Sequence, residues 1–168
     1  MASKSNWQTI ELPLLAEEDS KSLARLISPT LMPGDSVLLH GSIGTGKSTI
    51  AREILQSRMA EFGDIEDVPS PTFTLMQHYE IGGTDFIHCD LYRLGDVSEI
   101  DELGITEAFE TAVCLVEWAD RLEERTPPSA LKICISIGEN ADARNITLDF
   151  PSDRWTDLIQ RIRAHFDD

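Results

Sequence analysis

The chain has 168 residues, of which 41% are hydrophobic and 26% charged, a composition typical of a folded soluble protein. Its 30 acidic and 14 basic side chains give a formal net charge of −16, which argues against broad binding to DNA or RNA by this chain alone. The acidity either only keeps the protein in solution or suits a protein partner.

The chain contains no apolar run near the roughly 20 residues of a membrane span, and its N-terminus lacks the apolar region of a signal peptide. Its three cysteines are widely separated in apolar segments, which indicates reduced thiols rather than a disulfide framework. We therefore expect a cytoplasmic protein with a single domain over residues 1–168 and no membrane contact.

The first predicted elements precede a glycine-rich loop. Trp7–Leu12 alternates loosely and predicts an edge strand that ends at Pro13. Ala16–Ser28 predicts a helix with an acidic start and an apolar face. Ser36–His40 is a short apolar run of strand type that follows a turn signal.

The glycine-rich stretch Gly41–Ser48 fits the pattern G-x-x-x-x-G-K-[ST] of a phosphate-binding loop. Its glycines let the backbone turn and bring amide groups close to an anion, and the helix predicted at Ser48–Phe62 adds the positive end of its dipole. Lys47 would reach the β- and γ-phosphates, and the Ser48 hydroxyl would bind Mg²⁺. Strand, loop and helix occur in the order that the motif requires.

A proline-stiffened segment follows that helix. Val68–Glu80 is predicted to be extended and to continue as a strand, and Asp85–Tyr92 is the return strand of a hairpin. Thr72 and Asp90 would meet only in one register, which the sequence leaves open.

The next segments predict a buried strand at the centre of a sheet. Asp96–Leu103 and Ile105–Glu110 are short helical segments, and Thr111–Val116 is nearly all apolar, as in a parallel strand buried on both faces. Glu117 follows that strand. Ligands of α/β sheets bind at the carboxyl ends of strands, so Glu117 is expected to be the acidic ligand of Mg²⁺.

The C-terminal third predicts a polar helix at Trp118–Arg125, strands at Leu131–Ile137 and Asn145–Phe150, and a final helix that Ser152 caps and that runs to Phe166. The alternation of strands and helices predicts an α/β protein. We expect a three-layer P-loop NTPase-like fold, with a mixed, mostly parallel sheet flanked by helices and a β-hairpin after the P-loop helix.

Three function classes remain after the motif search. The chain lacks the Asn-Lys-x-Asp element of guanine-specific GTPases. A partner-activated ATPase, a P-loop small-molecule kinase and a nucleotide-sensing binding module all fit a phosphate loop, although the scattered arginines disfavour a kinase. The four histidines have no metal-ligand spacing and are predicted to be structural or exposed.

Five segments together resemble one family. They are Gly41–Thr49, Ser70–Leu75, His88–Leu94, Glu102–Ile105 and Leu115–Trp118. In this order and spacing the chain is similar, from about Glu17 to Trp118, to TsaE (formerly YjeE), the ATPase of bacterial tRNA threonylcarbamoyladenosine synthesis. The resemblance implies ATP and Mg²⁺ as ligands. It also implies association with the TsaB–TsaD complex, which modifies the adenosine beside the tRNA anticodon. TsaE itself does not transfer the group, and its contact with tRNA is expected to be indirect.

The motif and the resemblance together predict the site residues. Lys47, Thr72, Asp90 and Glu117 are the catalytic candidates, and Ser48 and Glu117 the metal ligands. The candidates for nucleotide binding are Glu17, Gly41, Ser42, Ile43, Gly44, Thr45, Gly46, Lys47, Ser48, Thr49 and Trp118. Two simpler interpretations stay open: Asp90 caps a turn or pairs with Arg93, and Trp118 is only an aromatic residue of the rim or core.

Overall fold

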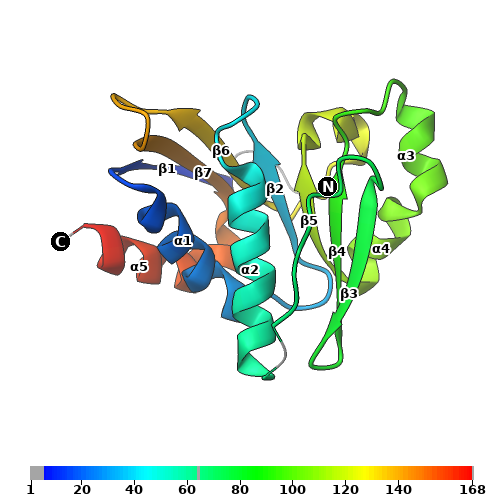
Figure 1. Cartoon of the computed structure of the whole chain (residues 1–168), viewed down its shortest axis with the longest axis horizontal. Coiled ribbons are helices and arrows are strands. Elements are labelled where there is room, and N and C mark those ends of the chain that lie inside the picture. Colours follow the sequence, from blue (N-terminus) through cyan, green and yellow to red (C-terminus); the bar gives the residue numbers. More distant parts are fainter. Residues whose placement is uncertain (1–5, 64, 168) are drawn as a thin grey trace.

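A computed structural model describes residues 6–63 and 65–167 and contains a seven-stranded sheet in the order β1-β7-β6-β2-β5-β4-β3 (Figure 1). The strands are β1 (Trp7–Leu14), β2 (Ser36–His40), β3 (Met76–Ile81), β4 (Thr84–Asp90), β5 (Val113–Glu117), β6 (Leu131–Ile137) and β7 (Arg144–Pro151). The helices are α1 (Glu17–Ile27), α2 (Lys47–Glu61), α3 (Val97–Leu103), α4 (Ile105–Thr111) and α5 (Ser152–Phe166), with the 3₁₀ helices η2 (Ser28–Thr30) and η3 (Ala119–Arg125).

The sheet is mixed, as predicted, with parallel strands in the middle and antiparallel strands at both edges. Strands β6, β2, β5 and β4 pair in parallel, whereas β1, β7 and β3 pair antiparallel to their neighbours. All five residues of β5 are buried, as expected for a parallel strand covered on both faces. The carboxyl ends of β2, β4 and β5 therefore lie at one edge of the sheet.

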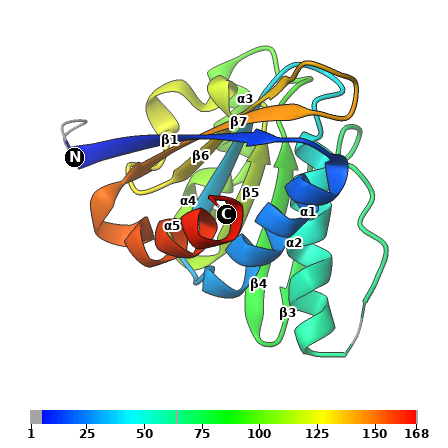
Figure 2. The ribbon, with the colours of Figure 1, turned by 90° about the vertical axis from the view of Figure 1, so that its left-hand side faces the viewer.

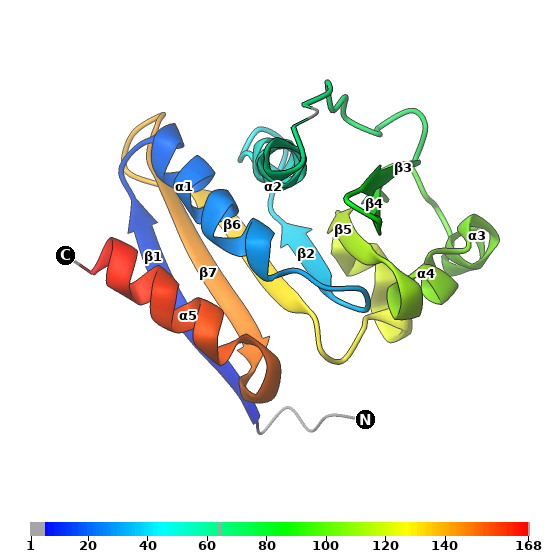
Figure 3. The same cartoon turned by 90° about the horizontal axis from the view of Figure 1, so that it is seen from below.

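Two hydrophobic clusters lie on opposite faces of the sheet. One face packs against α1, α2 and α5 (Figure 2), whereas α3, α4 and η3 cover the other face near β4 and β5 (Figure 3). The second cluster buries Cys89 and Cys114, and this burial raises the pKa of each thiol to about 12. All three cysteines are free, and within residues 6–63 and 65–167 no helix is long and apolar enough to cross a membrane.

The structure corrects several predicted boundaries. β1 continues through Pro13 to Leu14, because an edge strand can accommodate a residue without an N–H. The predicted helix at 118–125 is a 3₁₀ helix that begins at Ala119 and is interrupted at Glu123. Ser152 is the first residue of α5 rather than its cap, since Pro151 occupies the cap position.

The segment before β3 is the largest correction, because residues 71–74 form a turn instead of extended chain. The Leu75 amide donates to Pro71 O at 2.6 Å, and Leu75 adopts a φ of 68°, a left-handed value that is unusual for this side chain. β3 begins only at Met76 and pairs antiparallel with β4 across Gly82 and Gly83. The turn therefore lies beside the end of β4.

Trp155 on α5 provides a test of the hydrophobic cluster on the face of the sheet that α1, α2 and α5 cover. Its ring is fully buried, and its indole N–H donates to Ser129 O at 2.8 Å. We predict that Trp155→Ala lowers the free energy of unfolding by about 3–5 kcal/mol, because it opens a cavity and leaves a carbonyl without its donor. Leu15→Ala, at a side chain that is 78% exposed, should change it by less than about 0.5 kcal/mol. Chemical denaturation measures both values, and similar effects would contradict the packing described.

Candidate functional site

The predicted phosphate loop joins the central strand β2 to α2 at the carboxyl edge of the sheet (Figure 1). Gly41 has a φ of +151°, and a Cβ atom there would lie 2.6 Å from Ile135 O and 2.7 Å from Thr45 Oγ1. A side chain at position 41 would therefore collide with the backbone of β6. Gly46, with a φ of +107°, precedes the first residue of α2, so the loop leads directly into a helix N-terminus.

The Lys47 side chain folds back over this loop. Its Nζ donates to Gly41 O at 2.6 Å and to Ser42 O at 2.9 Å, and it lies 4.3 Å from the centroid of the Trp118 ring. Burial lowers the pKa of Lys47, an effect opposed by the charges of Glu117, Asp90 and Asp120. Neutral carbonyls are weaker partners for an ammonium group than anionic oxygens, so Lys47 can exchange them for a phosphate.

Glu117 ends β5 beside the start of α2, and its side chain is almost fully buried. Ser48 Oγ donates to Glu117 Oε1 at 2.7 Å. Two adjacent oxygen donors next to a phosphate loop fit Mg²⁺, which takes few protein ligands and completes its shell with water and phosphate. The described residues form no group of three or more His, Cys, Asp or Glu that could hold a metal by itself.

Asp90 ends β4 and lies opposite Glu117 in the parallel register of β4 and β5. Its Oδ2 accepts a hydrogen bond from Thr72 Oγ1 at 3.1 Å, and its Oδ1 accepts one from the Tyr92 amide at 2.9 Å. The structure thus brings together Thr72 and Asp90, a pairing that the sequence left open. Asp90 does cap the following turn, while the Arg93 guanidinium lies 5.5 Å from the centroid of the Phe73 ring.

Most of the predicted site residues line two cavities on either side of the loop. The larger, of about 430 Å³, is lined by Ile43, Gly44, Gly46, Lys47, Ser48, Thr49, Thr72, Asp90, Tyr92, Glu117 and Trp118. The smaller, of about 150 Å³, is lined by Glu17, Ser20, Gly44, Thr45, Gly46, Thr49 and Arg144. Gly41 and Ser42 line neither cavity and instead form the base of the loop, where their carbonyl oxygens hold Lys47.

Three residues of this region were not predicted as site residues. His88 is buried, and its Nε2 lies 2.6 Å from Glu117 Oε2. Its position two residues before Asp90 on one strand, hence on the same face, could have indicated this. Tyr92 packs on Trp118 with ring centroids 4.8 Å apart. Arg144 donates to Thr45 O at 2.8 Å from a segment that carries no motif.

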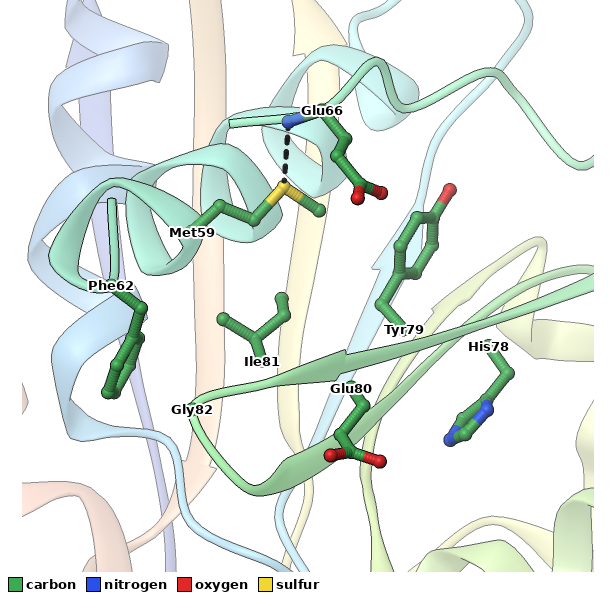
Figure 4. Close-up of a pocket in the computed structure, with 8 residues that line it drawn as sticks. All are labelled: Met59, Phe62, Glu66, His78, Tyr79, Glu80, Ile81 and Gly82. Carbon is green, nitrogen blue, oxygen red and sulfur yellow. Dashed lines mark hydrogen bonds between the residues drawn. The ribbon is translucent and has the colours of Figure 1, made fainter. Parts of the chain in front are cut away.

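A further pocket of about 340 Å³ lies at the opposite end of α2, against the β3–β4 hairpin (Figure 4). There the Phe62 ring occupies the space over Gly82, where a Cβ atom would lie 2.1 Å from it. The Glu66 amide donates to Met59 Sδ at 3.4 Å. None of the predicted site residues lines this pocket, so we assign it to the packing of the hairpin rather than to the loop.

Comparisons with known proteins agree with the motifs. The sequence profile of the family described as "Threonylcarbamoyl adenosine biosynthesis protein TsaE" matches residues 14–146. Among curated relatives, a "tRNA threonylcarbamoyladenosine biosynthesis protein TsaE" from Bacillus subtilis (strain 168) is 34% identical over 160 residues, covering 95% of this chain and 94% of the relative. The protein of that name from Rickettsia bellii is 36% identical over 147 residues, covering 86% and 97% of the two chains.

A solved structure extends the comparison to the fold. The crystal structure of Bacillus subtilis YdiB is similar with a TM-score of 0.75 and 28% sequence identity, over 96% of this chain and 98% of that chain. The predicted P-loop NTPase-like fold is thereby confirmed, as is the family resemblance stated from the motifs. The chain belongs to the TsaE family of tRNA threonylcarbamoyladenosine biosynthesis proteins.

Proposed function

We propose that this protein binds ATP with Mg²⁺ and hydrolyses it in tRNA threonylcarbamoyladenosine formation, acting with the TsaB–TsaD complex. The observation that carries the proposal is one cavity that brings together Lys47, Ser48, Thr72, Asp90 and Glu117 from four separate segments. Phosphoryl transfer to water needs positioning and charge stabilisation rather than covalent chemistry, and this set of groups supplies both.

The phosphates would lie against the loop amides and the N-terminus of α2, with Lys47 moving from the loop carbonyls to the β- and γ-phosphate oxygens. The smaller cavity on the other side of the loop suits the nucleoside, and Glu17 and Arg144 would line it. Trp118 would border the phosphates, where its ring already faces the Lys47 ammonium.

Ser48 and Glu117 would hold Mg²⁺, which supplies neutralisation of the charge that develops on the phosphate oxygens. Asp90 would orient the attacking water, because its carboxylate lines the same cavity and is fixed by two hydrogen bonds. Thr72, on the turn before β3, would sense the γ-phosphate through its hydroxyl. A turn held in this way can change its order with the state of the nucleotide.

The charges of the cavity favour a slow ATPase that depends on a partner. Of the described residues that line the larger cavity, Lys47 is the sole lysine or arginine. Efficient phosphoryl transfer uses further cationic groups around the transferred phosphate, so a partner is expected to complete the site. The same shortage of cations disfavours the alternative of a small-molecule kinase. The acidic surface suits indirect contact with tRNA, and a role in tRNA modification implies a cytoplasmic location.

Lys47→Ala tests the role of the loop lysine. We expect hydrolysis stimulated by TsaB–TsaD to fall by about 100-fold or more, because the variant loses the charge that stabilises the phosphates. Lys132→Ala is the matched control, since Lys132 lies over the Trp7 ring on β1 and should leave hydrolysis unchanged. The rate at which inorganic phosphate is released from ATP measures hydrolysis by both variants. Full partner-stimulated hydrolysis by Lys47→Ala would refute the proposed mechanism.

Gly41→Ala tests the geometry of the loop. Its Cβ would lie 2.6 Å from a β6 carbonyl, so the loop must shift, and we expect ATP affinity to fall by about tenfold or more. Gly83→Ala is the control for backbone strain, because φ there is +84° but no atom lies within 4 Å of the added Cβ. Calorimetric titration with ATP and Mg²⁺ measures both, and equal affinities would show that the loop does not depend on this contact.

Reconstituted modification separates the three function classes. We expect TsaB–TsaD to modify tRNA over repeated cycles only when this chain and ATP are both present. Normal modification with a non-hydrolysable ATP analogue would instead support a binding module without catalysis. Transfer of phosphate from ATP to a metabolite in the absence of protein partners would support the kinase.

A further inference from the structure

His88 is a buried polar residue of this region to which the proposed function gives no role. Its side chain is about 1% exposed, and its Nε2 lies 2.6 Å from Glu117 Oε2. Ser48 Oγ donates a hydrogen bond to Oε1, the other oxygen of the same carboxylate, at 2.7 Å. Each oxygen of Glu117 therefore has a different partner, one from α2 and one from β4.

The hydrogen-bond partners of His88 define which nitrogen carries the proton. An ionised carboxylate only accepts hydrogen bonds, so Nε2–H must be the donor to Glu117. Nδ1 is buried and has no hydrogen-bond partner among the described residues. An unpartnered N–H in the interior costs more than an unpartnered lone pair, which favours the tautomer with its proton on Nε2. His88 therefore acts on Glu117 through one defined bond.

Without this bond, Glu117 has an alternative partner. Burial lowers the pKa of Lys47 and the charge of Glu117 opposes that shift, so the two groups already interact across the cavity. A free Oε2 would let the carboxylate rotate toward the Lys47 ammonium, and this rotation would take Oε1 away from Ser48 and from the metal site. This motion would be a side-chain rotation alone, because the Glu117 backbone is held in the sheet and its carbonyl accepts from the Leu91 amide at 3.1 Å.

We propose that His88 is a positioning residue that holds Glu117 Oε2 through Nε2–H, so that Oε1 stays beside Ser48 and directed at the metal. The inference rests on the proposed function, because it assigns His88 to the Mg²⁺ site defined there. Residues that orient metal ligands in this way commonly raise metal affinity by about 10- to 100-fold. His88 does not touch the nucleotide, so binding of nucleotide without metal should not depend on it.

Two amide substitutions test the proposal. In His88→Gln the amide nitrogen of the new side chain reaches about as far from the backbone as Nε2 of His88. In His88→Asn the amide nitrogen reaches only about as far as Nδ1. We expect His88→Gln to keep most of the Mg²⁺ dependence of ATP-analogue binding. We expect His88→Asn to reduce Mg²⁺ affinity by about tenfold or more. Calorimetry of the full chain with a non-hydrolysable ATP analogue, with Mg²⁺ and with EDTA, measures both quantities.

The control is Cys89→Ala on the same strand. Cys89 is buried on the opposite face of the sheet, so this variant lowers stability without touching the site, and its Mg²⁺ dependence should match that of the unchanged chain. Binding with EDTA should be equal in all variants. If His88→Asn does not fold, His88→Gln decides alone, because loss of Mg²⁺ dependence in that folded variant contradicts the proposal.

The outcomes separate this inference from the proposed function. Mg²⁺ dependence that is retained in both amide variants, or lost in both, would overturn the role of Nε2–H. A parallel loss of binding with and without metal would show that His88 only supports the fold. If the unchanged chain itself bound the analogue without any effect of Mg²⁺, the proposed metal site would fail before His88 was tested.

Discussion

The hydrogen bond from Ser48 to Glu117 is the contact on which the site depends, because it links the end of the predicted phosphate loop to the predicted acidic metal ligand. Ser48 lies in the first turn of α2 and Glu117 ends β5, and the parallel pairing of β2 with β5 brings these two ends together. A carboxylate that is 2% exposed is costly unless donors satisfy both oxygens. The sheet register, the burial of Glu117 and the position of the loop therefore depend on one another. A change of register would separate Ser48 from Glu117 and leave a buried carboxylate oxygen without its donor.

The same register explains why Asp90 shares the cavity. β4 pairs in parallel with β5, so Asp90 and Glu117 lie side by side at the carboxyl edge and on the same face as α2. The turn before β3 is then fixed from two directions, since the Asp90 amide donates to Leu75 O at 2.9 Å and its carboxylate accepts from Thr72. These two contacts hold the turn beside the phosphate loop, where Thr72 lines the same cavity as Lys47 and Ser48.

The sequence predicted those parts of the protein that follow from local patterns. The loop, its flanking strand and helix, and Glu117 at the end of a wholly apolar run were predictable because each is defined within a few residues. Contacts that depend on how distant segments meet were not predictable. Arg144 reaches the loop only because β7 pairs with β6. The turn at 71–74 is held by the bond between Leu75 and Pro71, and Leu75 in turn accepts from the Asp90 amide of β4. His88 was interpreted from its spacing to other histidines, although its relevant neighbour is 29 positions away.

The balance of charge around the loop connects this geometry to the proposed dependence on a partner. The larger cavity contains the carboxylates of Asp90 and Glu117 and one ammonium group, that of Lys47. A bound triphosphate would add several negative charges to a protein that already has a net charge of −16. Mg²⁺ would offset part of this charge at Ser48 and Glu117, and Lys47 would offset another part. Among the described residues that line this cavity, none besides Lys47 offers a cation to the charge that develops in the transition state, so a basic group from a partner at the mouth of the cavity is the simplest way to make hydrolysis fast.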